Sequence, residues 1–133
     1  MKAIDDNIYE WINKADHDLG SAKIIYLNIP EYFDTIAFHC QQASEKYIKA
    51  TLLFFEIEFQ RSHDLVYLLD LLSQKINIDK EYFEKALNLN GFSVEIRYPN
   101  IKIFLTKEEL EYSIKVSEDF RAYAFKIIGI EES

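Results

Sequence analysis

Polar side chains repeat at helical spacing in the first half of the chain, at His39, Gln42, Lys46 and Lys49. Intervals of three, four and three residues place these side chains on one face of an α-helix. Lysine ammonium groups bind phosphate, and an imidazole can exchange a proton near neutral pH. The stripe therefore predicts either a site for a phosphate-bearing ligand or a solvated helix face with ion pairs such as Glu45 with Lys49.

A histidine–aspartate pair, His63-Asp64, stands at the start of a leucine-rich segment, with Arg61 beside it. The free N–H groups at a helix N-terminus suit anions. The pair therefore predicts either an anion-binding helix start or an ordinary capped helix with a surface histidine.

The third candidate is Arg97-Tyr98-Pro99, in a segment where apolar and polar residues alternate. A guanidinium can clamp a carboxylate or a phosphate through two hydrogen bonds. An arginine here could also tie its segment to the rest of the fold through a structural salt bridge. Both interpretations stay open at this point.

Other reaction chemistries lack their usual motifs. The sequence contains no CxxC pair, HExxH, GxxxxGK[ST] or GxGxxG, and nothing places a nucleophile beside a base. Asp16, His17 and Asp18 are adjacent, and adjacent side chains on a helix point in different directions, so we expect a solvated face there. We therefore expect no metal site and no cofactor other than a nucleotide ligand.

Composition favours long helices. Among 133 residues, 49% are hydrophobic and only three are glycine and two proline, which argues against a β-rich fold. The formal net charge of −8 makes DNA binding unfavourable. The apolar runs are too short to cross a bilayer and no signal peptide pattern is visible, so we expect a cytoplasmic protein.

Apolar periodicity predicts the elements. We expect an all-α, up-and-down bundle of four to five helices, forming a single domain over 1–133, with an extended connector over 92–105 before the last helix. The predicted helices span 5–27, 31–59, 62–76, 79–90 and 106–129.

The helix over 31–59 is the expected centre of the bundle, because its small residues allow other helices to approach closely, and Cys40 lies on its core face. The small residues are Ala37, Ala43, Ser44 and Ala50. In the fourth helix the residues predicted to face inward are Tyr82, Phe83, Ala86 and Leu87.

The ends of the later helices have recognisable signals. Ser62 is the expected N-cap of the third helix, and Asn90-Gly91 is the expected stop of the fourth. Thr106 with Glu109 three residues later matches a capping box. The last helix is expected to end near Gly129.

These residues also carry a family resemblance. The chain resembles the HEPN domain family (higher eukaryotes and prokaryotes nucleotide-binding) in the run Phe38-His39-Cys40-Gln41-Gln42-Ala43, then Glu45-Lys46 and Lys49-Ala50. The family's order continues with His63-Asp64-Leu65 and with Arg97-Tyr98-Pro99, after an early helix with Ala15, Asp18, Leu19 and Ala22. The likeness covers essentially the whole chain.

The resemblance implies an all-α bundle that is commonly dimeric. Stand-alone members are often encoded beside a minimal nucleotidyltransferase, with which they act as substrate-binding partner or as half of a toxin–antitoxin pair. We therefore expect a homodimer, a nucleotidyltransferase partner and a nucleotide ligand. The expected ligand contacts are His39, Gln42, Lys46, Lys49, His63, Asp64, Arg97 and Tyr98.

Many members of the family are metal-independent RNases, in which four to six residues separate an arginine from a histidine that serves as acid or base. No arginine of this chain has a histidine at that distance. The sequence therefore favours a binding protein over an enzyme. Two alternatives remain, an RNase with a rearranged site of Arg97 and His63, or an oligomerisation module with surface aromatics. Those aromatics are Tyr32, Phe33, Phe54, Phe55 and Phe59.

Overall fold

The computed structural model describes residues 4–95 and 104–132, and within them it contains five helices and no strand. The helices are α1 (Asp6–Asn28), α2 (Phe33–Phe54), α3 (Leu65–Leu72), α4 (Lys80–Glu95) and α5 (Lys107–Ile128). The all-α, up-and-down bundle is therefore confirmed. None of the described helices is long and apolar enough to cross a membrane.

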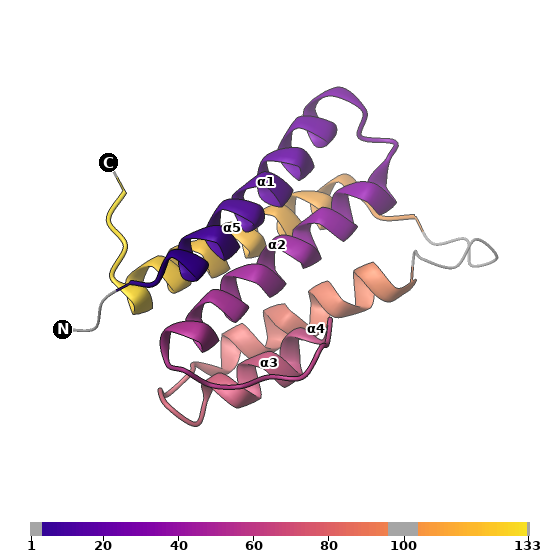
Figure 1. The fold of residues 1–133 in the computed structure, drawn as a ribbon. Coiled ribbons are helices and arrows are strands. Elements are labelled where there is room, and N and C mark those ends of the chain that lie inside the picture. The colour runs from indigo at the N-terminus through magenta and orange to yellow at the C-terminus, as the bar shows by residue number, and fades with distance from the viewer. Residues whose placement is uncertain (1–3, 96–103, 133) are drawn as a thin grey trace.

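Helix α2 is the central helix. It packs against each of the other four helices, and α1 lies antiparallel beside it (Figure 1). Helix α5 covers the back of the α1–α2 pair, while the short α3 and the longer α4 close the lower side in this view. Polar residues on α2 are consequently enclosed by neighbours from several elements.

Two predicted helix boundaries are confirmed in atomic detail. The Thr106 hydroxyl accepts from the Glu109 N–H at 3.1 Å, and the Glu109 carboxylate accepts from the Thr106 N–H at 2.8 Å, which completes the capping box. Gly129 ends α5 in the left-handed conformation with φ 86°. At the first helix, Asp5 is the N-cap, and its side chain accepts from the Asn7 N–H.

The predicted helix over 31–59 is too long, because α2 ends at Phe54. Glu56 takes a left-handed conformation with φ 58°, the Glu56 N–H donates to the Leu53 carbonyl, and the Ile57 N–H donates to the Leu52 carbonyl. This is the usual pattern of a helix terminus, with glutamate where glycine is common. The apolar periodicity continues past this terminus, so periodicity alone could not locate it.

The boundaries of α3 and α4 also differ from the prediction. Asp64, rather than Ser62, caps α3, accepting from the N–H groups of Val66 and Tyr67. Helix α4 continues through Asn90-Gly91 to Glu95, so the predicted stop at these two residues is wrong. The first residues of the predicted extended connector are therefore helical as well.

Asn90 serves the neighbouring helix instead. Its side chain donates to Asp64 and accepts from the Leu65 N–H, which joins α4 to the start of α3. Leu87 was predicted to face inward, but it is exposed and Leu89 occupies the core instead. The remaining connector residues, 96–103, lie outside the described residues, and with them Arg97, Tyr98 and Pro99.

Small buried residues do bring α2 close to α5, as predicted. The hydroxyl groups of Ser44 and Ser117 lie 3.1 Å apart across the contact, and both donate to the Cys40 carbonyl, at 2.9 and 2.8 Å. All three residues are fully buried. The contact is therefore both tightly packed and saturated with hydrogen bonds.

We expect Cys40 to be chemically inert in the folded protein. Burial raises the pKa of its thiol to about 12, an effect that the hydrogen bond with Ser117 opposes only in part and the charge of Glu118 reinforces. Because the thiolate is the reactive form, an aromatic disulfide reagent should modify the native protein at least about a thousandfold more slowly than the unfolded chain.

The matched control is a cysteine at the exposed position 17 (His17→Cys) in a Cys40→Ala background, which should react at once. Rapid modification of Cys40 without denaturant would show that the α2–α5 contact opens readily.

Candidate functional site

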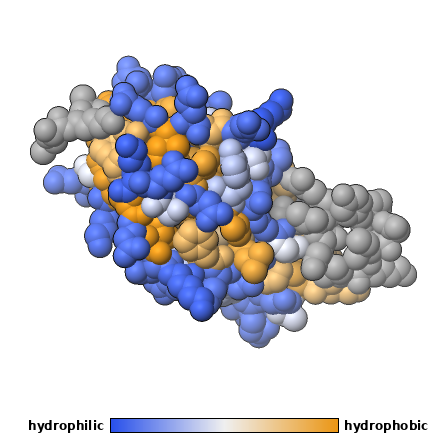
Figure 2. Space-filling model, turned by 90° about the horizontal axis from the view of Figure 1, so that it is seen from below, coloured by the Kyte–Doolittle hydropathy of each residue, from blue (hydrophilic) through white to orange (hydrophobic). Residues whose placement is uncertain are grey.

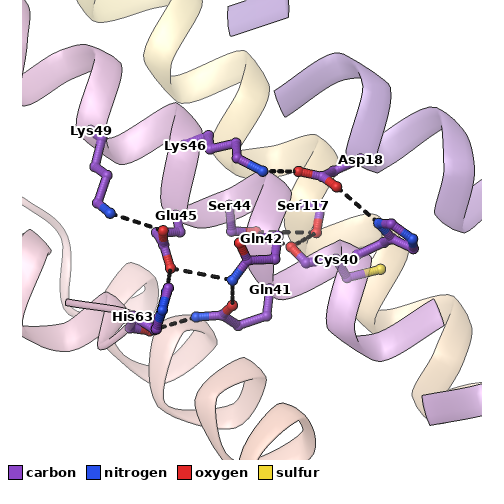
Figure 3. Close-up of polar contacts among 11 residues, drawn as sticks. Asp18, Cys40, Gln41, Gln42, Ser44, Glu45, Lys46, Lys49, His63 and Ser117 are labelled. Atoms are coloured by element: carbon purple, nitrogen blue, oxygen red, sulfur yellow. Dashed lines mark hydrogen bonds and ion pairs between the residues drawn. The ribbon is translucent and has the colours of Figure 1, made fainter. Parts of the chain in front are cut away.

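The polar stripe of α2 faces its neighbours rather than solvent. Asp18 of α1 lies between two of its residues, accepting from Lys46 and lying 2.9 Å from Nδ1 of His39 (Figure 3). All three side chains are largely buried. The interpretation of the stripe as a solvated face is therefore wrong. In the segment of Asp16, His17 and Asp18 the same interpretation holds for His17, which is exposed, and fails for Asp18.

Glu45 is the centre of a second cluster on the same helix. One carboxylate oxygen accepts from Lys49 Nζ at 2.9 Å, and the other lies 2.8 Å from Nδ1 of His63 and 3.5 Å from Gln42 Nε2 (Figure 3). The Glu45 side chain is only 4% exposed and that of Lys49 only 7%. The predicted pair of Glu45 with Lys49 thus exists, but in the interior.

Aromatic rings surround the buried ammonium group. Lys49 Nζ lies 5.6 Å from the ring centroids of both Trp11 and Phe59. Attraction between a cation and the ring faces compensates part of the lost hydration. The aromatic neighbours and Glu45 together explain how a lysine is accommodated inside the bundle.

His63 is held at both its side chain and its main chain. Gln41 Nε2 donates to the His63 carbonyl at 2.5 Å, while Gln41 Oε1 accepts from Gln42 at 2.8 Å. The imidazole is still 56% exposed. Since Nδ1 faces Glu45, the opposite ring nitrogen, Nε2, is directed away from the carboxylate and can meet a ligand.

An open groove of about 600 Å³ adjoins His63 on the α3–α4 side. Its lining consists of Ser62, His63, Asp64, Val66, Leu87 and Asn90. Figure 2 views the molecule from this side, where hydrophobic residues show among hydrophilic ones. Asp64 is engaged as the cap of α3, so His63 is the residue of the predicted pair that can offer a hydrogen-bond donor.

The predicted ligand contacts therefore fall into two neighbouring clusters on α2. Glu45 brings together Gln42, Lys49 and His63, and Asp18 brings together His39 and Lys46. Asp64 lies beside His63 in the groove. Arg97 and Tyr98 fall outside the described residues, so their predicted role stays a prediction.

Sequence reasoning missed the carboxylates that organise these clusters. The sequence predicts Glu45 as a surface partner of Lys49 and places Asp18 on a solvated face, whereas both carboxylates are largely buried. The sequence does contain one signal of this arrangement, which is an acidic residue, Glu45, among basic and glutamine residues. A carboxylate in that setting can be buried only if several of these neighbours donate hydrogen bonds to it.

A third cluster, on the α1–α5 side, was also missed. The Tyr47 hydroxyl donates to Asp16, which lies 2.9 Å from Nε of Arg121. Burial is the main cause, and the hydrogen bond to Asp16 the second, of a pKa of Tyr47 far above its usual value, so this phenol stays protonated. Arg121 also pairs with Glu132 and lies over the Phe125 ring. These contacts stabilise the packing of α5 on α1 and α2.

Comparison with known proteins points to one family. A model of the HEPN domain matches residues 8–128. No curated protein matches the sequence. Among solved structures, an archaeal HEPN homologue is 24% identical with a TM-score of 0.74, over 91% of this chain and 97% of that one.

Two bacterial structures are also similar. A protein from Thermus thermophilus is 22% identical with a TM-score of 0.78, over 90% of this chain and 97% of that one. A HEPN domain protein from Thermotoga maritima is 24% identical with a TM-score of 0.57, over 90% and 92%. These likenesses show the fold, and the family model spans most of the sequence. The chain therefore belongs to the HEPN domain family.

Proposed function

We propose that this chain is an accessory binding module that holds a nucleotide or another phosphate-bearing ligand at the Glu45–His63 cluster and acts together with a nucleotidyltransferase. Family membership supports a nucleotide-binding or RNase-type domain in general terms. The observation that carries the proposal is His63, held by a buried carboxylate at the edge of an open groove.

The charges of the two clusters suit an anionic ligand. Each carboxylate, Asp18 and Glu45, is shared by one lysine and one histidine. Basic groups therefore outnumber the carboxylate in each cluster, and a phosphate group can accept hydrogen bonds from them.

Replacement of His63 should abolish the response to nucleotide. The melting temperature of the parent protein should rise by several degrees with millimolar ATP, because ligand at about 100 times its Kd adds roughly 2.7 kcal/mol. His63→Ala should remain folded without ATP, because Lys49 and Gln42 still reach Glu45, and it should lose the ATP-dependent shift.

The matched control is His17→Ala, which removes an exposed histidine from α1. This control should keep the full shift. Equal shifts in the parent and in His63→Ala would rule out the site, and the absence of any shift in the parent would rule out ATP as its ligand.

The proposed partner is a minimal nucleotidyltransferase, in line with the family resemblance. Co-expression with a nucleotidyltransferase encoded beside this chain should give a complex of fixed stoichiometry by size exclusion with light scattering. Two independently eluting proteins would contradict the pairing.

RNA cleavage is a second candidate, favoured by the same geometry. A buried carboxylate that orients an imidazole suits a general acid or base. The reaction also needs a cation at the scissile phosphate, for which Arg97 is the candidate from the sequence. Cleavage of RNA by the purified chain, lost in His63→Ala, would favour this function over simple binding.

A further inference from the structure

The end of the bundle opposite the described chain ends presents apolar side chains to solvent. The turn between α1 and α2 lies there beside the start of α5 (Figure 1). Leu27 is 78% exposed, Phe104 75% and Ile24 63%. Together with Ile29 and Tyr32, which are also exposed, they form what we call the apical patch.

The patch is continuous with a groove. An open cavity of about 570 Å³ is lined by Tyr26, Leu27, Pro30, Leu105, Leu110 and two charged residues, Lys107 and Glu111. Phe104 packs on Phe33 with ring centroids 5.6 Å apart, which links the start of α5 to the start of α2. Exposed apolar surface that is gathered over three segments in this way is typical of an interaction site.

The charge around the apical patch is negative. Glu31 and Asp34 flank Tyr32 and are exposed, and Glu108 and Glu111 are exposed in the first turns of α5. Burial, a hydrogen bond with Glu111 and the charge of Glu108 all raise the pKa of Tyr26, so these carboxylates act on the groove itself.

Within 4–95 and 104–132, the residues that the structure describes, basic side chains do not balance these carboxylates. Lys107 lines the groove, and Lys23, one turn before Leu27, pairs with Glu118 at 2.8 Å. The described part of the chain around the patch therefore carries more negative than positive charge.

This charge pattern selects among possible occupants. A second copy of the chain would bring the same carboxylates against these, and like charges across an interface cost free energy. Nucleic acid and anionic membranes are repelled for the same reason. A segment with apolar anchors flanked by lysine or arginine complements both the apolar centre and the acidic surroundings.

We propose that the apical patch is the docking surface for a basic amphipathic segment of the partner protein. The proposal rests on the proposed function, in which this chain acts with a protein partner, and it adds the chemistry of that partner. The patch lies apart from His63, so the two sites can be tested separately.

Synthetic peptides test the proposal directly. The probe is an amphipathic helix of about 18 residues with leucine on one face and lysine on the other, long enough to form several helical turns. It is compared by fluorescence anisotropy with the same peptide carrying glutamate. The lysine peptide should bind the parent and lose affinity as salt rises, and the glutamate peptide should not bind.

Variants locate the binding on the chain. Leu27→Ser and Phe104→Ser should each weaken the lysine peptide roughly tenfold, as the loss of an apolar anchor does. Tyr9→Ser, which removes an exposed aromatic at the other end of α1, should leave affinity unchanged. The reversal Glu108→Lys with Glu111→Lys should abolish binding of the lysine peptide and confer binding of the glutamate peptide.

Three outcomes would overturn the proposal: equal binding in Leu27→Ser and the parent, equal binding of both peptides, or a dimer of the parent that Leu27→Ser dissociates. The melting shift with ATP, measured on the same variants, should stay unchanged, because His63 is intact in them. A parent protein that shows the ATP shift but binds no lysine peptide would therefore reject the docking surface alone. A parent that binds the lysine peptide but shows no ATP shift would reject the nucleotide site alone.

Discussion

Replacing Glu45 by alanine should lower the free energy of unfolding by about 3–5 kcal/mol, the usual cost of removing one partner from a buried ion pair. The reason is Lys49, whose ammonium group would stay enclosed near Trp11 and Phe59 without a counter-charge. His63 and Gln42 would lose their acceptor as well. Urea denaturation gives the measurement, as a lower midpoint at an unchanged slope.

A double-mutant cycle identifies the cause of this loss. Lys49→Met fills similar space without charge, so Glu45→Ala combined with Lys49→Met should recover at least half of the stability lost in Glu45→Ala. Glu45→Gln keeps the shape and one acceptor, and should cost less than alanine does. Additive effects of the two single changes would mean that the charges do not interact, which their 2.9 Å separation contradicts.

Loss of the Glu45 carboxylate should also weaken the proposed binding of nucleotide at His63. His63 takes its orientation from this oxygen at 2.8 Å. A variant that folds but lacks the carboxylate leaves the imidazole held only at its main chain, through Gln41. The ATP-dependent melting shift should therefore fall in Glu45→Gln even where the bundle remains intact.

The architecture could be predicted because, in a helix with one apolar face, apolar residues recur every three or four positions in the sequence. The stripe of α2 through Ala37, Cys40, Ser44 and Tyr47 is buried throughout. The boundary errors arose where backbone conformation departs from residue preference. Glu56 takes a left-handed conformation that glycine usually adopts. Gly91 lies inside α4, although glycine more often stands where a helix ends.

The candidate site could be predicted in its residues but not in its orientation. His39, Gln42, Lys46 and Lys49 share a face, and that face alone gives no information on whether solvent or another helix covers it. A polar stripe normally indicates solvent. Here α1 supplies Asp18 and the segment before α3 supplies His63, both distant in sequence. Only the three-dimensional arrangement shows that each basic group meets a carboxylate.

The second large effect is expected at the contact between α2 and α5. Ser117→Leu should lower the free energy of unfolding by about 3 kcal/mol, because overpacking a filled core costs roughly 1–3 kcal/mol and the lost hydrogen bonds add about 1 kcal/mol. The Ser117 hydroxyl lies 3.1 Å from that of Ser44 and 2.8 Å from the Cys40 carbonyl, so no space is available for a larger side chain. Calorimetry should show a fall in Tm of roughly 10 °C for a domain of this size.

Ser117→Ala separates the two contributions to this loss. It removes the hydroxyl and adds no volume, so it should cost only about 1 kcal/mol. If leucine cost no more than alanine, α5 would be free to move away from α2, and the close approach could not be a requirement of the fold. A large difference between the two variants means that the helix separation is fixed. Ser44 and Ser117 would then be required for their size more than for their hydroxyl groups.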